Sequence, residues 1–130
     1  MRVWTIATQS PDYAAQDLSG AGAKITGGRW NRHGLAVLYC ADKASLACLE
    51  TLFHLGAGGL PLQRYLIAID IPDAVWKVRE THTAQTFPSK RNVCPVSQAS
   101  TDFGDLIRAP AKITLTALLR FASDRGASRR

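Results

Sequence analysis

The chain has 130 residues, a mass of 14.1 kDa and a formal net charge of +6. This length fits one domain, and the 46% hydrophobic and 20% charged residues exclude a disordered chain. No apolar run approaches the roughly 18 residues of a membrane span, and the first residues lack the apolar core of a signal peptide. We therefore expect a cytoplasmic protein that makes no membrane contact.

The positive charge is concentrated at the C-terminal end of the chain. Residues 108–130 hold six Lys or Arg and one acidic residue, a net charge of +5. Residues 1–107 hold ten Lys or Arg and nine acidic residues, a net charge of +1. Aromatic residues do not interleave with these basic residues as they do in a single-strand binding groove. A solvated basic tail and a surface that contacts nucleic acid or an acidic partner both stay open.

The first forty residues predict two strands separated by a loop. Residues 3–7 alternate loosely between apolar and polar side chains, which favours a strand. Residues 19–34 contain several glycines and are typical of a loop. Residues 35–40 form a compact apolar run, which predicts a buried strand.

A helix is predicted next, from Asp42 to about residue 55. Asp42 is a suitable N-cap. Leu46, Leu49 and Phe53 recur at helical spacing, so we expect them to form one buried stripe.

The second half of the chain contains the clearest strand. Residues 65–71 are apolar and β-branched and end at a proline, which predicts a strand. Residues 81–103 are polar and contain two prolines, so we expect irregular structure there, and residues 113–121 fit either a strand or a helix. Strands outnumber helices in this prediction, which favours an α+β or α/β fold around a central sheet.

The cysteines and histidines are not spaced as metal ligands, so we expect no metal. The cysteines are Cys40, Cys48 and Cys94, an odd number. Because Cys40 and Cys48 lie in apolar stretches, we expect them to be buried free thiols. The histidines are scattered along the chain at His33, His54 and His82.

Three side chains are candidates for a functional site. Glu50 lies beside the predicted apolar stripe, where a carboxylate is costly to desolvate without a partner; a glutamate that reaches solvent at the helix edge is the alternative. Arg29 follows two glycines and could bind a diphosphate with both guanidinium arms, or it could stack on Trp30 in a turn. Tyr39 ends a predicted strand, either at the rim of a pocket or in simple packing.

Several segments, in this order and at similar spacing, resemble the motifs of the RES-domain toxins of type II toxin–antitoxin systems. The segments are residues 19–23, 27–31, 37–41, 47–50 and 65–72. The resemblance implies one RES domain over residues 1–130, with a good match over residues 1–76. It implies a single-domain α+β fold similar to the ADP-ribosyltransferases, with mainly antiparallel central sheets and flanking helices.

The resemblance also implies the site residues, because the family is named after an arginine, a glutamate and a serine. The arginine, the glutamate and a tyrosine of the same pocket match Arg29, Glu50 and Tyr39. The serine matches Ser123, although Phe121 and Ala122 before it depart from the family pattern. Phe103-Gly104-Asp105 resembles a further landmark, but we expect residues 104–130 to be diverged or truncated relative to the family.

From the family we expect a toxin that consumes NAD as its substrate by cleaving the nicotinamide–ribose bond through hydrolysis or phosphorolysis. The alternatives are ADP-ribosyl transfer to a cellular protein and an inactive relative that still binds its antitoxin. The implied partner is an Xre-type antitoxin, through which DNA would be contacted only indirectly; self-association stays open. A small basic nucleic-acid-binding module is the alternative from another functional class.

Overall fold

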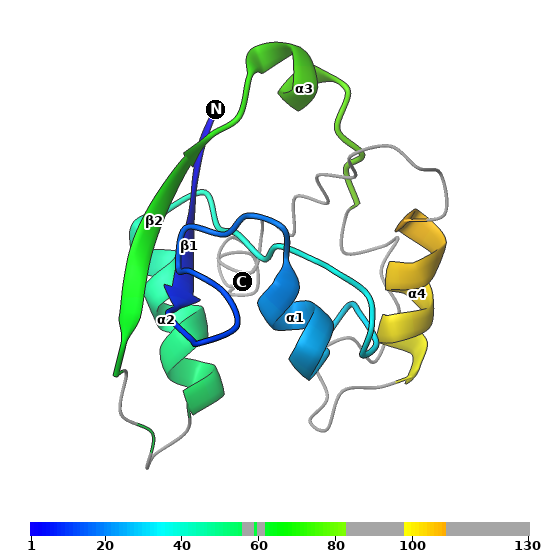
Figure 1. Cartoon of the computed structure of the whole chain (residues 1–130). Helices are drawn as coiled ribbons and strands as arrows, with labels where there is room; N and C mark the ends of the chain where they lie inside the picture. The colour runs from blue at the N-terminus through cyan, green and yellow to red at the C-terminus, as the bar shows by residue number, and fades with distance from the viewer. Residues whose placement is uncertain (56–58, 60–61, 83–97, 109–130) are drawn as a thin grey trace, which may run out of the picture.

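The computed structural model describes residues 1–55, 59, 62–82 and 98–108 (Figure 1). The elements in chain order are β1 (Arg2–Thr8), α1 (Ala21–Thr26), α2 (Ala44–Leu55), β2 (Arg64–Asp70), α3 (Asp73–Lys77) and α4 (Gln98–Arg108). The predicted α+β class is confirmed. The described residues contain four helices and two strands, so the expectation that strands outnumber helices is wrong for this part of the chain.

The two predicted outer strands form one antiparallel pair. β1 pairs with β2 from Arg2 opposite Asp70 to Thr8 opposite Arg64. Val3 and Thr5, two residues apart, are buried, as expected for the covered face of a strand. Both strand predictions and the antiparallel pairing are therefore confirmed.

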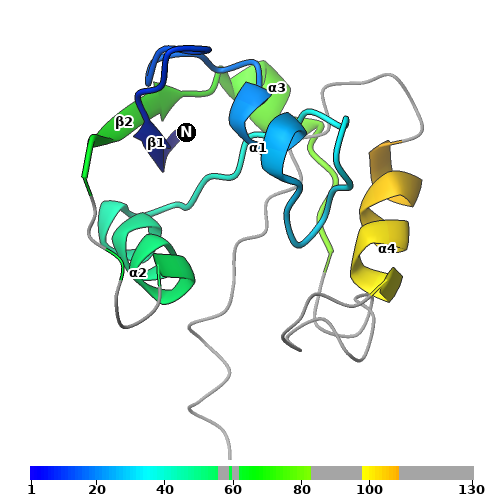
Figure 2. The same ribbon diagram turned by 60° about the horizontal axis from the view of Figure 1, so that its bottom comes forward.

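The helix α2 packs against β1, which places it beside the sheet (Figures 1 and 2). The predicted helix is confirmed, although it begins two residues after Asp42. The predicted buried stripe is wrong, because Leu49 and Phe53 are 63% and 74% exposed. The helix is turned so that the small Ala47 is covered in place of these larger residues.

Residues 35–40 do not form the predicted strand. Only the next residue, Ala41, pairs with β1, through two hydrogen bonds of 2.7 Å with the backbone of Trp4. The preceding segment instead crosses Gly20, where an added Cβ would come within 2.7 Å of the Val37 nitrogen. The apolar run is therefore only partly covered, with Leu38 37% exposed, and it lacks the regular pairing of a strand.

The glycine-rich stretch predicted as a loop contains the helix α1. Gly20 and Gly27 flank it with φ values of 76° and 68°, in the left-handed region that favours glycine. The Lys24 amide donates to the Gly20 carbonyl at 3.0 Å, and the Gly27 amide donates to the Ala23 carbonyl at 2.8 Å. A helix of six residues is too short for its apolar spacing to be recognised among glycines.

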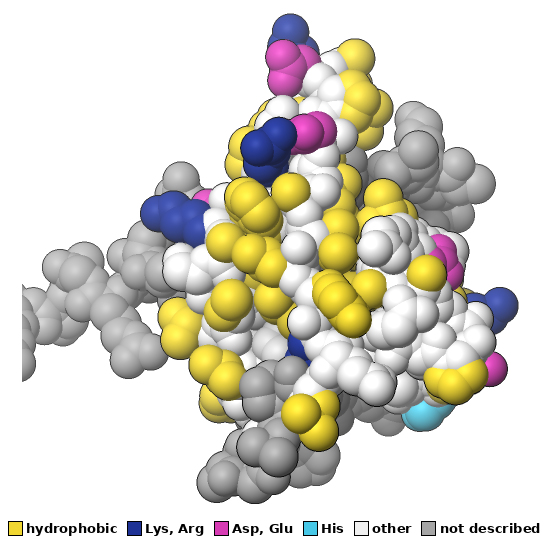
Figure 3. Space-filling model, turned by 60° about the vertical axis from the view of Figure 1, so that its left-hand side comes forward, with side chains coloured by type: hydrophobic (Ala, Val, Ile, Leu, Met, Phe, Trp, Pro, Cys, Tyr) yellow, Lys and Arg dark blue, Asp and Glu magenta, His cyan; other side chains and the backbone are white. Residues whose placement is uncertain are grey.

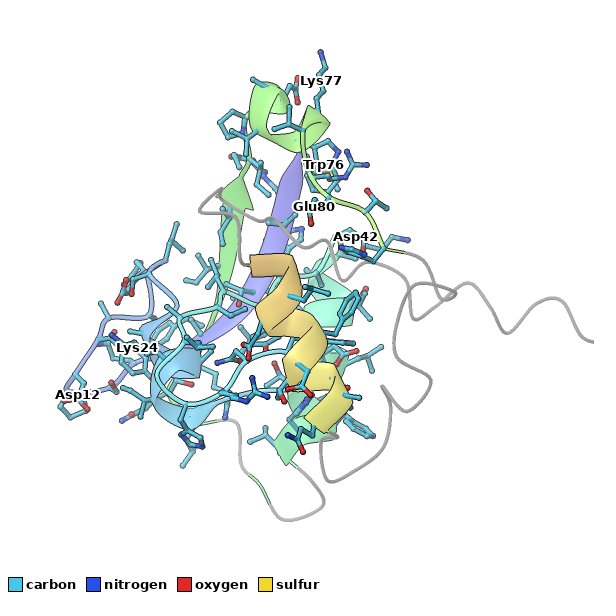
Figure 4. The ribbon with its side chains drawn as sticks, turned by 90° about the vertical axis from the view of Figure 1, so that its right-hand side faces the viewer. Asp12, Lys24, Asp42, Trp76, Lys77 and Glu80 are labelled. Atoms are coloured by element: carbon cyan, nitrogen blue, oxygen red, sulfur yellow. The ribbon has the colours of Figure 1, made fainter. Side chains whose placement is uncertain are left out.

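The helix α4 lies at the opposite end of the described structure from β2 (Figures 1, 2 and 4). It includes residues 98–103, which were predicted to be irregular, so that prediction is wrong for these six residues. The prediction for residues 113–121, the basic segment after residue 108, Cys94 and Ser123 all lie outside the described residues.

Hydrophobic side chains gather over the face that β2 presents to solvent (Figure 3). The large exposed apolar residues of β2 and α2 are Leu49, Leu52, Phe53, Tyr65 and Leu66. None of the helices in the described ranges has the length and hydrophobicity that crossing a membrane requires.

Candidate active site

A cavity of about 440 Å³ lies among segments that are far apart in the sequence. Its wall is formed by β1, the end of α1 with the turn that follows it, residues 39–41, α2 and the first residue of β2. The side chains on this wall that can carry charge, protons or hydrogen bonds include Arg29, Tyr39, Cys40, Glu50, Thr51, His54 and Arg64. This volume is typical of a small-molecule site.

Three of the four predicted site residues line this one cavity. Arg29 and Tyr39 come from the segments before α2, and Glu50 comes from α2 itself. A cationic group, an aromatic ring and a carboxylate are therefore brought together although Arg29 and Glu50 are 21 positions apart in the sequence. The fourth predicted residue, Ser123, lies outside the described residues.

Arg29 occupies a tight turn. The Gly28 amide donates to the Asn31 carbonyl at 3.0 Å, so Arg29 and Trp30 are the two central residues of the turn. Trp30 is 4% exposed and meets Phe103 edge to face, with ring centroids 6.0 Å apart. A buried ring at the next position anchors the turn that carries Arg29.

One face of α2 forms a wall of the cavity. Ala47, Glu50, Thr51 and His54 lie three or four residues apart and therefore share this face. The Glu50 side chain is exposed, as in the alternative of a glutamate that reaches solvent. Its carboxylate therefore stays hydrated and does not incur the free-energy cost of desolvation. The Nδ1 atom of His54 lies 2.7 Å from the Glu50 carbonyl oxygen and carries the proton of that hydrogen bond, because a carbonyl oxygen can only accept.

Several residues of the cavity lining were not predicted as site residues. Thr51 and His54 could have been found from their helical spacing to Glu50. Arg64 gave no signal beyond its place before a strand. Asn31, which lies outside the cavity lining, was visible only as the residue that follows Trp30 in a glycine-rich motif.

Two acidic residues of α4 hold the turn region by ion pairs. The Arg32 guanidinium binds the carboxylates of Asp102 and Asp105 with separate nitrogens. These aspartates lie three residues apart and so project from the same face of α4. The arrangement joins α4 to the segment that directly follows the Arg29 turn.

Gly104 allows α4 to approach the same turn at its backbone. A Cβ built on Gly104 would overlap the carbonyl oxygen of Trp30. Phe103, beside it, contacts the Trp30 ring and also meets His82 edge to face at 5.2 Å between centroids. The Phe103-Gly104-Asp105 motif thus supports the Arg29 turn from the side of α4.

The two described cysteines are free thiols in different environments. Cys40 lines the cavity and is partly buried, and this burial raises the pKa of its thiol to about 11. Cys48 is exposed, so the expectation that both thiols are buried is wrong for Cys48. Cys48 is exposed because it directly follows the buried Ala47 and so lies on the side of α2 that faces solvent.

We expect iodoacetamide to alkylate Cys48 much faster than Cys40 at pH 8. With a pKa of about 11, about one Cys40 thiol in a thousand is ionised at this pH, and the thiolate is the nucleophile. Peptide mass spectrometry over time measures each site separately. The Cys40 rate should keep rising as the pH is raised toward 11, and equal rates at pH 8 would contradict the assignment.

No group of three or more His, Cys, Asp or Glu side chains within residues 1–55, 62–82 and 98–108 is arranged to hold a metal ion. His33, for example, bonds the Ile25 carbonyl through Nδ1 at 2.8 Å.

Comparison with known proteins identifies related toxins. A protein named Prs ADP-ribosylating toxin, from Sphingobium sp. (strain YBL2), is 52% identical over 101 residues, which are 78% of this chain and 63% of that protein. A protein named Toxin Res, from Photorhabdus laumondii, is 36% identical over 92 residues, 71% of this chain and 57% of that protein. Another Toxin Res, from Yersinia enterocolitica, is 42% identical over 62 residues, 48% of this chain and 41% of that protein.

This chain therefore spans at most 63% of the length of these three relatives. The family model described as the RES domain matches residues 2–129. The match agrees with the motifs found in the sequence, and the α+β structure is consistent with the ADP-ribosyltransferase-like fold that the resemblance implies. We conclude that the chain belongs to the RES domain family.

Proposed function

We propose that this protein is a toxin that consumes NAD by cleaving the bond between nicotinamide and ribose. The observation that carries the proposal is that Arg29, Tyr39 and Glu50, the residues matching the family's motifs, line one cavity of about 440 Å³. The name of the 52% identical relative, an ADP-ribosylating toxin, supports the same substrate, since ADP-ribosylation uses the ADP-ribose part of NAD.

Glu50 is proposed to stabilise the reacting ribose. When the glycosidic bond breaks, the electron pair leaves with neutral nicotinamide and the ribose gains oxocarbenium character. A carboxylate fixed beside the ribose stabilises this positive charge and accepts a hydrogen bond from a ribose hydroxyl. An oxygen of the acceptor then bonds to the anomeric carbon, and the acceptor's proton is released.

Arg29 is proposed to bind the diphosphate of NAD. Its planar guanidinium can donate two parallel hydrogen bonds to phosphate oxygens. Arg64 adds a second guanidinium to the same cavity wall, against the single carboxylate of Glu50. Among the described residues, this wall therefore carries more positive than negative charge, which suits a diphosphate with two negative charges.

Tyr39 is proposed to contact the nicotinamide ring through its own ring. Ser123 is assigned to the pocket by the resemblance alone, as a side chain that exchanges one hydrogen bond with the substrate. No metal is needed in this scheme, because the carboxylate and the guanidinium supply the charges.

The acceptor defines three versions of the reaction. Water gives ADP-ribose, phosphate gives phosphorylated ADP-ribose, and a protein side chain gives a modified protein. Protein transfer is the second candidate function, because the Sphingobium relative is named for it. An Xre-type antitoxin is the proposed partner, and the use of NAD fits action in the cytoplasm; a homo-oligomer is compatible with both.

The test is to incubate the purified protein with NAD labelled in the adenine ring, with and without phosphate and with a cell extract. We expect released nicotinamide, and the labelled product identifies the acceptor. The absence of nicotinamide above background in every condition would refute NAD cleavage and favour an inactive relative. After induction in cells, steady NAD levels during growth arrest would contradict NAD consumption as the cause of toxicity.

Arg29→Lys is expected to raise the KM for NAD about 10- to 100-fold, because lysine keeps the charge but loses the paired hydrogen bonds. Nicotinamide release at varied NAD concentration measures the effect. Arg2→Lys is a matched control, since Arg2 binds Asp70 outside the cavity lining, and its KM should be unchanged. A KM for Arg29→Lys within twofold of the unaltered protein would contradict diphosphate binding by Arg29.

A further inference from the structure

Asn31 is a buried polar side chain that the proposed chemistry does not use. It is 1% exposed, and its Nδ2 atom donates to the carbonyl oxygens of Ala23 at 2.8 Å and Leu35 at 2.9 Å. A third contact, to the Arg32 carbonyl, is 3.2 Å long. The side chain thus joins α1, the Arg29 turn and the segment that leads to Tyr39.

The other side of the same amide binds the Tyr39 hydroxyl. The hydroxyl donates its proton to Oδ1 of Asn31 at 2.7 Å and accepts the backbone N–H of Trp30 at 3.0 Å. The amide cannot be reversed without setting its oxygen against three carbonyl oxygens, so its orientation is determined. The one proton of the Tyr39 hydroxyl is therefore used in the hydrogen bond to Asn31.

Gly28 shows how closely these groups enclose the turn. An added Cβ would lie 2.7 Å from Oδ1 of Asn31 and 2.7 Å from the Tyr39 hydroxyl. The Gly28 amide also closes the turn onto the Asn31 carbonyl at 3.0 Å. The amide and the hydroxyl therefore contact the turn at Gly28 and at Trp30, on both sides of Arg29.

We propose that the buried Asn31 and the half-buried Tyr39 hydroxyl form a clamp that positions the Arg29 turn, and that this hydroxyl exchanges no proton with the substrate. Asn31 is a positioning residue, since it acts through Tyr39 and the turn. The part of the proposal that concerns NAD rests on the proposed function, whereas the clamp itself can be tested without NAD.

Tyr39→Phe is the decisive variant, because it removes the hydroxyl and keeps the ring on the cavity wall. Hydrogen exchange of the Trp30 amide, followed by NMR on the full chain without NAD, should become about tenfold faster when the amide loses its acceptor. Tyr65→Phe makes the same chemical change on β2, outside the cavity lining, and should leave this exchange rate unchanged. Unchanged exchange in Tyr39→Phe would overturn the clamp whether or not the protein consumes NAD.

Kinetics test the second half of the proposal. In Tyr39→Phe the KM for NAD should rise about tenfold because Arg29 is less well positioned, and the pH profile of kcat should keep its shape. Loss of one limb of that profile would show that the hydroxyl transfers a proton and would overturn this half. Failure of the unaltered protein to cleave NAD would count against the proposed function alone, since the exchange measurement stands separately.

Discussion

Glu50→Gln is expected to lower the rate of nicotinamide release about 10²- to 10³-fold. Glutamine has nearly the same shape as glutamate but carries no charge, so it cannot stabilise the positive charge that develops on the ribose. Because the Glu50 side chain is exposed, the substitution should change the free energy of unfolding by less than about 0.5 kcal/mol. The two measurements together separate loss of chemistry from loss of fold.

The chain offers a matched control for this experiment. Its only other glutamate, Glu80, is absent from the cavity lining and lies 3.7 Å from His82. Glu80→Gln should therefore release nicotinamide at the rate of the unaltered protein. A Glu50→Gln protein that stays folded and retains more than about a tenth of the rate would remove Glu50 from the proposed chemistry.

Gly104→Ala is expected to destabilise the protein by about 2–3 kcal/mol and to lower NAD cleavage with it. In an ordinary helix, this change would favour folding by about 1 kcal/mol, because alanine has the higher helix propensity. Here the new methyl group would overlap the Trp30 carbonyl oxygen, a backbone atom that cannot move without displacing the Arg29 turn. Urea unfolding gives the change in free energy.

Gly22→Ala is the corresponding control in α1. Its added Cβ would meet the end of the Tyr13 side chain at 3.2 Å, and a side chain can move aside. The stability should stay within about 1 kcal/mol of the unaltered protein. If Gly104→Ala were as stable as Gly22→Ala, α4 would not be packed against the turn as the structure has it.

The elements with a clear period could be predicted from the sequence, and those defined by glycine could not. β1, β2 and α2 have the length and spacing that identify a strand or a helix locally. α1 was hidden because Gly20 and Gly27, which define its ends, are equally typical of a loop. The rotation of α2 was also hidden, because it depends on how the whole helix packs against β1, which helical spacing does not reveal.

The candidate site was predictable only in part, for a similar reason. Arg29, Tyr39 and Glu50 could be named because they match motifs, yet their approach to one cavity depends on how distant segments fold. Asn31 donates hydrogen bonds to backbone carbonyl groups, which every residue type carries. These bonds therefore cannot be recognised from the sequence. Arg64 reaches the cavity only because β2 pairs with β1 along its full length.

The ion pair between Arg32 and Asp102 joins residues 70 positions apart, and this separation matters during synthesis. A nascent chain that has emerged only as far as α2 already contains Arg29, Tyr39 and Glu50, but it lacks α4, the helix that supports the Arg29 turn. Distant contacts form late, after the intervening chain has left the ribosome. We therefore expect the Arg29 turn to gain this support only after α4 has been synthesised, well after the residues that line the cavity.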